Sequence, residues 1–204
     1  FRPWWWPKRA CSVRMSLAGW PHCPRQVEVN RPYLDPDTYT TVDNGDAAYT
    51  ESGTWSNIDP AAGYGDDARY ATEGGSTDTA DWSFTSLTAG TRYELLVTWP
   101  GDSQAADDAP FSVYDGTAAG ALLETIEVNQ QIDPPDHPAF TGNWLSLGTF
   151  VPTGTQLTVR LTDDVSTAGA RVIADAVRLI EAGPTSQTVY DDAGQVYQSI
   201  DALG

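Results

Sequence analysis

The chain has 204 residues, 40% of them hydrophobic, and a formal net charge of −17. Its 18 Gly and 14 Pro favour short strands joined by tight turns over long helices. So acidic a chain repels phosphate backbones, which argues against nucleic acid as a partner. No run of 18 apolar residues is present, which argues against insertion into a membrane.

The N-terminal segment differs from the rest in charge and composition. Residues 1–34 contain six basic side chains and one acidic one, a charge of +5, whereas the remainder carries −22. Pro recurs through residues 1–38 without any hydrophobic period, which predicts an irregular, extended arm. Opposite charges attract, so we expect the arm of one copy to meet the body of another.

The side chains of this arm are of the kinds that anchor protein interfaces. Three consecutive Trp residues need a surface to cover them, because an exposed cluster of this kind aggregates. We therefore predict that the arm docks on a neighbouring subunit and builds a homo-oligomer or filament. The predicted contact residues are Trp4, Trp5, Trp6, Arg9, Arg14, Trp20 and Arg25.

The two cysteines, Cys11 and Cys23, both lie in the arm. A disulfide between them predicts an extracellular or cell-surface protein, because such bonds persist in oxidising compartments. Zinc with His22 is the alternative, although a structural zinc takes four ligands. The start at Phe1 and the character of both ends predict a piece of a longer precursor.

From residue 39 onward, apolar and polar residues alternate in short runs, which predicts strands. Trp82 and Phe84 alternate with polar neighbours, as do Leu157, Val159 and Leu161. Strands with one polar face each predict an all-β fold, an antiparallel β-sandwich of the jelly-roll kind. It occupies residues 39–182, between the arm (1–38) and a C-terminal extension (183–204). The predicted strands are 39–43, 53–56, 68–71, 79–84, 93–99, 111–114, 122–128, 144–150, 157–161 and 171–180.

Acidic residues gather in the predicted turns. Asp43, Asn44 and Asp46 lie beside a Gly and offer the oxygen ligands that calcium prefers, although without the spacing of a recognised calcium loop. They are a candidate calcium site, the alternative being a solvated turn. On a strand, Asp175 would share a face with apolar residues, and a buried carboxylate requires a partner. The candidate partners are Arg69, Arg92, Arg160, Arg171 and Arg178.

Aromatic residues near the predicted loops are candidates for stacking on sugar rings, with core packing as the alternative. These residues are Trp55, Tyr64 and Trp144. Enzyme signatures are absent, since there is no G-x-S-x-G, no Walker loop and no H-E-x-x-H, and the sole histidine outside the arm is His137. We therefore expect no catalytic activity and no cofactor beyond a structural calcium.

Several segments together resemble a known family. They are VDNGD (42–46), SGTW (52–55), YGDDARYA (64–71), ADWSF (80–84), AGTRYELLVTWP (89–100), DAPFSVYDG (108–116), EVNQQ (127–131), WLSLGTF (144–150) and VIADAVRL (172–179). In order and spacing they resemble the golvesin C-terminal-like domain, also described as the xanthan-lyase carbohydrate-binding-like domain, over residues 42–180. The resemblance implies an accessory sandwich of large secreted bacterial proteins, with no established catalytic residues.

A shorter resemblance lies at the C-terminal end. Residues 189–204, VYDDAGQVYQSIDALG, resemble one YD repeat of Rhs-type proteins. Two functions follow from these observations. The first is a structural or adhesive module that the arm assembles into a fibre or surface layer. The alternative is a carbohydrate-binding accessory module with a polysaccharide as partner.

Overall fold

The structure is a computed structural model that describes residues 27–29, 34–58, 62–137, 142–182, 187–190 and 196–200. The predicted interface residues of the arm and the predicted Cys11–Cys23 disulfide lie outside these residues. The chain divides into two compact units, and the larger unit contains residues Arg31–Thr185. Among the described residues, no helix has the length and apolar character needed to cross a bilayer.

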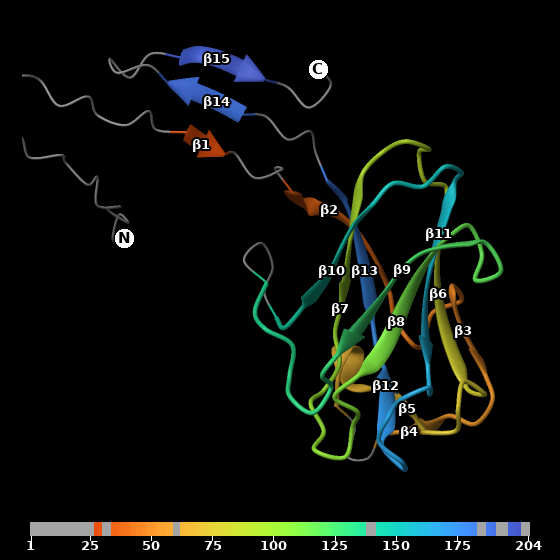
Figure 1. Cartoon of the computed structure of the whole chain (residues 1–204). Helices are drawn as coiled ribbons and strands as arrows, with labels where there is room; N and C mark the ends of the chain where they lie inside the picture. Colours follow the sequence, from red (N-terminus) through yellow and green to blue (C-terminus); the bar gives the residue numbers. More distant parts are fainter. Residues whose placement is uncertain are drawn as a thin grey trace, which may run out of the picture. The chain divides into compact units, whose positions relative to one another are not determined.

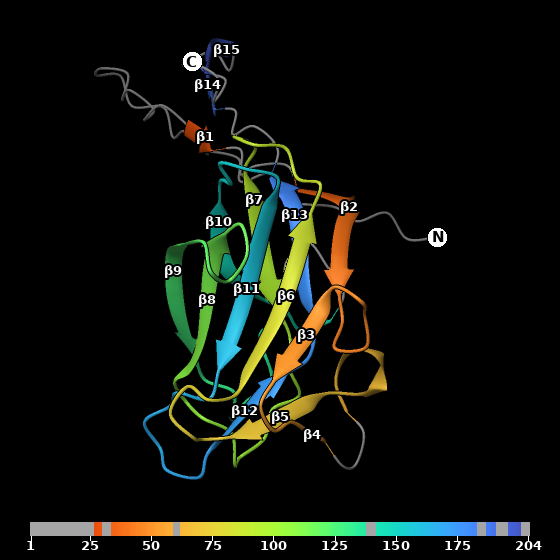
Figure 2. The ribbon, with the colours of Figure 1, turned by 90° about the vertical axis from the view of Figure 1, so that its right-hand side faces the viewer.

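Two antiparallel sheets form the body of the larger unit (Figures 1 and 2). The four-stranded sheet has the order β10 (Leu145–Phe150), β7 (Tyr93–Val97), β13 (Val177–Ala182) and β2 (Leu34–Val42). The five-stranded sheet has the order β3 (Tyr49–Ser52), β6 (Thr79–Thr85), β11 (Gln156–Thr162), β8 (Ala109–Asp115) and β9 (Ala121–Val128).

The order of the strands is that of a jelly roll. Along the chain, β2, β7, β10 and β13 belong to one sheet, and β6, β8, β9 and β11 to the other, with β3 added at an edge. A third, small sheet of β12 (Arg171–Ala174), β5 (Arg69–Thr72) and β4 (Ser56–Asn57) lies at one end of the sandwich (Figure 2). The predicted all-β antiparallel sandwich is confirmed.

The core lies between the two large sheets and follows the alternation of the sequence. Trp82 and Phe84 of β6 are buried, whereas Asp81 and Ser83, which alternate with them, are half-buried. On β11, three apolar residues are completely buried in the same register. Burying large apolar side chains on the inner faces of both sheets supplies the main stabilisation of such a fold. The most deeply buried side chains include Trp82, Leu95, Val97, Phe111, Val113, Leu157, Val159 and Leu161.

The polar side chain of Gln130 is completely buried. Its amide nitrogen donates to the carbonyl of Ile173 and its amide oxygen accepts from the N–H of the same residue, both at 2.8 Å. The side chain therefore completes the hydrogen bonding of β12 on the side that faces away from β5, which removes the cost of burying unpaired groups.

Two predicted strands differ from the structure. The predicted strand at 53–56 is wrong, because β3 ends at Ser52 and β4 begins at Ser56. Gly53 has a φ of 95°, and the next N–H, of Thr54, donates to Asp78 at 2.9 Å, so a turn replaces the strand. The predicted strand at 171–180 is two strands, because the chain leaves β12 after Ala174 and enters β13 at Val177.

The smaller unit contains a sheet with the order β1 (Val27–Val29), β14 (Gln187–Tyr190) and β15 (Val196–Ile200). Both pairings are antiparallel. Strand β1 was not predicted, so part of the segment assigned to the irregular arm is regular. The resemblance of residues 189–204 to a YD repeat stays a prediction.

Candidate functional site

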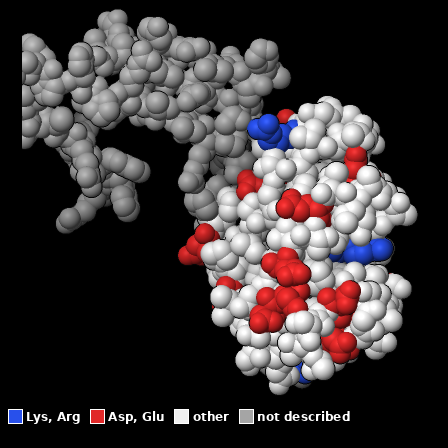
Figure 3. Space-filling model, in the orientation of Figure 1, with Lys and Arg blue, Asp and Glu red and all other residues white. Residues whose placement is uncertain are grey.

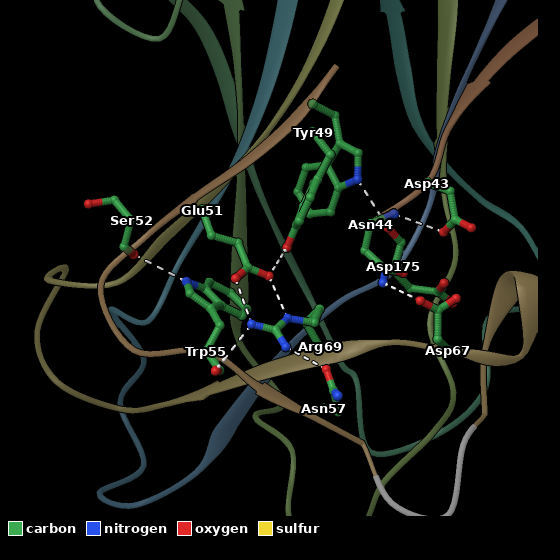
Figure 4. A network of polar contacts seen from close by, with 11 residues as sticks. Asp43, Asn44, Tyr49, Glu51, Ser52, Trp55, Asn57, Asp67, Arg69 and Asp175 are labelled. Atoms are coloured by element: carbon green, nitrogen blue, oxygen red, sulfur yellow. Dashed lines mark hydrogen bonds and ion pairs between the residues drawn. The ribbon is translucent and has the colours of Figure 1, made fainter. Parts of the chain in front are cut away.

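Three carboxylates from distant parts of the chain meet at one end of the four-stranded sheet. Asp43 directly follows β2, Asp175 lies between β12 and β13, and Asp67 follows the short 3₁₀ turn η1 (Tyr64–Asp66). Figure 4 shows the three side chains close to one another, with Asn44 beside Asp67. We call this group, Asp43, Asn44, Asp67 and Asp175, the carboxylate cluster.

The turn at η1 positions the cluster, and its glycines are required for its backbone. Gly63 has a φ of 113° and Gly65 a φ of 73°, values that residues with a side chain rarely adopt. A Cβ on Gly63 would lie 2.9 Å from Asp175 Oδ2, and one on Gly65 would lie 2.9 Å from Asp43 Oδ2. The bare backbone of the turn therefore packs directly against the carboxylates.

Asp175 is the buried member of the cluster, with 1% of its surface exposed. The N–H of Tyr64 lies 3.0 Å from each of its carboxylate oxygens and donates to both. Burial raises the pKa of Asp175 to about 8, and the charges of Asp43 and Asp67 add to this rise, while the Tyr64 hydrogen bond opposes it. Its burial was expected from the sequence, but its donor is a backbone N–H rather than an arginine.

The outer part of the cluster is closer to solvent. Asn44 donates from Nδ2 to Asp67 Oδ2 at 2.8 Å, and its N–H donates to Asp43 Oδ1 at the same distance. Asn44 Oδ1 is buried and has no hydrogen-bond donor. Burial raises the pKa of Asp43, opposed by the Asn44 N–H and reinforced by the charges of Asp67 and Asp46. The cluster therefore holds spare acceptors and excess negative charge.

The predicted calcium site is only partly assembled. Asp43 and Asn44 belong to the cluster, but Asp46 is exposed and its Oδ2 accepts the N–H of Asp43 at 2.9 Å, which closes the turn after β2. Among the described residues, no group of three or more His, Cys, Asp or Glu side chains is placed to hold a metal ion. Calcium at these residues stays a prediction.

Next to the cluster, aromatic rings and an arginine form a continuous stack. The guanidinium of Arg178 lies 4.1 Å from the ring centre of Tyr39 and 4.0 Å from that of Trp144. The Trp144 ring meets Tyr64 edge to face, with the ring centres 5.7 Å apart. These distances are typical of cation–π and aromatic pairs. We call Tyr39, Arg178, Trp144 and Tyr64 the aromatic stack.

Exposure divides the aromatic stack into a buried middle and two accessible ends. Trp144 and Arg178 are 3% and 5% exposed, whereas Tyr39 and Tyr64 are 46% and 40% exposed. Of the residues predicted to stack on sugars, Tyr64 is thus accessible, and Trp144 is covered. Trp55 is also buried in the core, and its Nε1 donates to the carbonyl of Ser52 at 3.2 Å.

Tyr39 was missed as a site residue, although the sequence held a signal for it. Tyr39 and Thr41 alternate with Val42, which is buried in the core, so their side chains lie on the outer face of β2. Arg178 donates from Nε to Thr41 Oγ1 at 3.0 Å, which fixes the arginine against this face. The position of Tyr39, on the opposite face of the strand from the apolar Val42, was the signal in the sequence for an exposed ring.

A second polar network has a structural role. Arg69 donates to both carboxylate oxygens of Glu51, at 2.7 and 2.8 Å, and Tyr49 donates to the same carboxylate at 2.8 Å (Figure 4). Burial opposes ionisation of Glu51, but these two donors hold its pKa below the usual value. Arg69 also donates to Asn57 and to the carbonyl of Trp55. The network joins β3 to the small sheet and leaves Arg69 neutralised.

The outer face of the five-stranded sheet is mostly polar, and its polar side chains form hydrogen bonds with one another. Arg160 pairs with Asp81 through two hydrogen bonds of 2.7 Å, and Ser112 Oγ lies 2.8 Å from Thr125 Oγ1. The half-buried Tyr114 is the aromatic residue of this face. The face lacks the paired exposed rings seen at the aromatic stack.

Comparison with known proteins identifies the family to which the larger unit is similar. The family model of the Golvesin C-terminal domain matches residues 40–181. A xanthan lyase from Paenibacillus is similar in structure, with a TM-score of 0.55 and 25% identity over 71% of this chain and 13% of the lyase. No curated protein matches the sequence.

Two other solved structures are less similar. An exo-β-1,3-galactanase from Phanerochaete chrysosporium has a TM-score of 0.44 and 10% identity over 70% of this chain and 29% of its own. The CBM22-1 and GH10 modules of xylanase 10B from Clostridium thermocellum have a TM-score of 0.39 and 14% identity over 77% of this chain and 28% of their own. The chain therefore spans less than a third of the length of each of these proteins.

Proposed function

The chain belongs to the Golvesin C-terminal domain family, and on that basis we propose that it is a non-catalytic, carbohydrate-binding accessory module of an extracellular or cell-surface protein. The observation that carries the proposal is the aromatic stack, whose two ends, Tyr39 and Tyr64, expose their rings on either side of a buried Arg178–Trp144 pair. The similarity to part of a xanthan lyase supports the same function.

The stack has the chemistry that a sugar chain requires. The apolar faces of sugar rings pack on exposed aromatic rings, which are amphipathic and lose little conformational freedom on binding. The buried pair holds both tyrosine side chains in place, so they lose little conformational entropy when a sugar binds. Asp43 and Asp67 lie against the Tyr64 turn, where a Cβ on Gly65 would be 2.9 Å from Asp43 Oδ2 and 3.4 Å from Asp67 Oδ1, and they offer acceptors to sugar hydroxyls.

Retention of the full chain on a panel of insoluble and gel-embedded polysaccharides tests the proposal. Tyr39→Ala and Tyr64→Ala should each weaken retention roughly tenfold, because each removes one stacking surface. Tyr114→Ala, on the other sheet, is the matched control and should bind as the native chain does. Loss of binding in Tyr114→Ala alone would show that the site lies on the five-stranded sheet. If the native chain is retained on no polysaccharide, the proposed function is wrong.

A second candidate function is assembly through the N-terminal arm. The opposite charges of residues 1–34 and of the remainder, +5 and −22, favour it, as do the three adjacent Trp residues. Its test is sedimentation of the full chain beside a variant with Trp4, Trp5 and Trp6 changed to Ala. Assembly should be lost in the variant and should weaken at high salt in the native chain. A native chain that sediments as a monomer at low salt would exclude it.

A further inference from the structure

From the charges around Tyr64 we infer that the carbohydrate site selects uncharged polysaccharides and rejects those carrying carboxylate, sulfate or pyruvate groups. This inference rests on the proposed function and names the class of ligand for the same site. It concerns specificity, so it can fail while carbohydrate binding itself holds.

Negative charge surrounds the exposed ring of Tyr64 on several sides. Asp66 and Asp67 follow it in the chain and are exposed, and Asp46 is exposed on the turn after β2, close to Asp43. Asp175 also accepts the Tyr64 N–H, but its pKa of about 8 keeps it mostly protonated at neutral pH, so the negative charge comes from the exposed carboxylates. The face of the molecule seen in Figure 3 likewise shows many more acidic than basic side chains.

Positive charge near the site is small and already occupied. Arg178 is 5% exposed, with its guanidinium between the Tyr39 and Trp144 rings. The charge of Arg69 is matched by Glu51 at 2.7 Å. Among the described residues, no ion pair involves Asp43, Asp46, Asp66, Asp67 or Asp175. A sugar bound on Tyr64 therefore meets the carboxylates of Asp46, Asp66 and Asp67, which have no ion-pair partner in the part of the chain that the structure describes.

Two of the carboxylates, Asp43 and Asp67, can accept hydrogen bonds from sugar hydroxyls, whereas Asp46 and Asp66 contribute charge alone. A carboxylate accepts a short, charge-assisted hydrogen bond from a sugar O–H, and it repels an acidic substituent at the same distance. A site rich in acceptors and poor in cations thus discriminates by repulsion as well as by attraction.

Paired probes with one backbone and different charge test the inference. Hydroxyethyl cellulose is compared with carboxymethyl cellulose, methyl-esterified polygalacturonan with polygalacturonate, and xanthan serves as a further acidic probe. For every backbone that the full chain binds, the acidic member should bind at least tenfold more weakly at low salt, and the difference should shrink as salt screens the charges.

Charge-neutral variants assign the effect to the site. Asp46→Asn with Asp66→Asn should strengthen binding of the acidic member about tenfold and leave the uncharged member unchanged. The control, Glu124→Gln with Glu127→Gln, makes the same change in net charge on β9, at the opposite edge of the other sheet, and should alter neither. Equal binding of both members by the native chain, or equal effects of both double variants, would overturn the inference. Absence of binding to any probe would instead remove the proposed function.

Discussion

The indole Nε1 of Trp82 donates a hydrogen bond to the backbone carbonyl of Asp175, 3.0 Å away. Trp82 lies on β6 of the five-stranded sheet, and Asp175 lies where the chain passes from the small sheet into β13. The contact therefore links the core directly to the residue whose carboxylate holds the Tyr64 turn.

Trp82→Phe should lower the free energy of unfolding by about 2 to 4 kcal/mol, because it leaves a cavity and an unpaired carbonyl. The same change should loosen the Tyr64 turn and weaken polysaccharide binding, although Trp82 is 1% exposed and therefore out of reach of a bound sugar. Urea denaturation and a retention assay measure the two effects. Native stability in the variant would show that the contact is unimportant.

Asp175 makes stability depend on pH in an unusual direction. Its pKa is about 8 in the folded protein and close to 4 when unfolded, so between these values the folded state holds a proton that the unfolded state has lost. The stabilising contribution is complete below pH 4 and is lost as pH rises towards 8, by at most about 1.4 kcal/mol per pH unit.

Asp175→Asn should remove this decline, because the amide does not titrate and its oxygen still accepts the Tyr64 N–H. The variant should exceed the native protein in stability at pH 8 and above. Urea midpoints at intervals between pH 4 and 9 give the comparison. Parallel pH profiles for the two proteins would contradict the assignment to Asp175.

Gly63→Ala should lower the free energy of unfolding by about 1 to 3 kcal/mol and weaken polysaccharide binding, since the residue has a φ of 113° and its Cβ would lie 2.9 Å from Asp175 Oδ2. Gly45→Ala is the control. A Cβ there meets nothing within 4 Å, so its effect should stay within about 0.5 kcal/mol. Similar thermal stabilities of the two variants would mean that the turn tolerates a side chain.

Gln130→Met keeps the length of a buried side chain but removes both hydrogen bonds to Ile173. Two buried backbone groups then lack partners, and we expect a loss of about 2 to 5 kcal/mol. Gln131→Met, at the exposed neighbouring position, should change stability by less than about 0.5 kcal/mol. Denaturant unfolding of both variants measures how much the two hydrogen bonds of Gln130 contribute to the free energy of unfolding.

Alternation of apolar residues was sufficient to predict the sandwich. Strands β6 and β11 follow the expected pattern closely, because each has one face in the core and one in solvent. The strand predicted at 53–56 failed, since a local pattern does not show that Asp78, 24 residues further on, caps the N–H of Thr54. Likewise, the exit from β12 at Asp175 depends on contacts with Tyr64 and Trp82, both distant in sequence.

The site was only partly predictable for the same reason. Residue type identified Tyr64, Asp43 and Asn44 as candidates, but their arrangement depends on Asp67 and Asp175, which the fold brings together. Trp144 looked like a loop aromatic, yet the ring packs on Arg178 and is covered. Sequence patterns report which side chains face outward from a strand. They do not report which ones a neighbouring loop then covers.

The pairing of β2 with β13 has a mechanical consequence. These are the first and last strands of the sandwich, and they run antiparallel with Leu34 opposite Ala182 and Val42 opposite Val177. Tension applied at the two ends of the larger unit, Arg31 and Thr185, therefore acts first on the Leu34–Ala182 pair and separates the strands one residue pair at a time, instead of loading all their hydrogen bonds together. Strands paired in this geometry separate under lower pulling forces than strands that are sheared along their length.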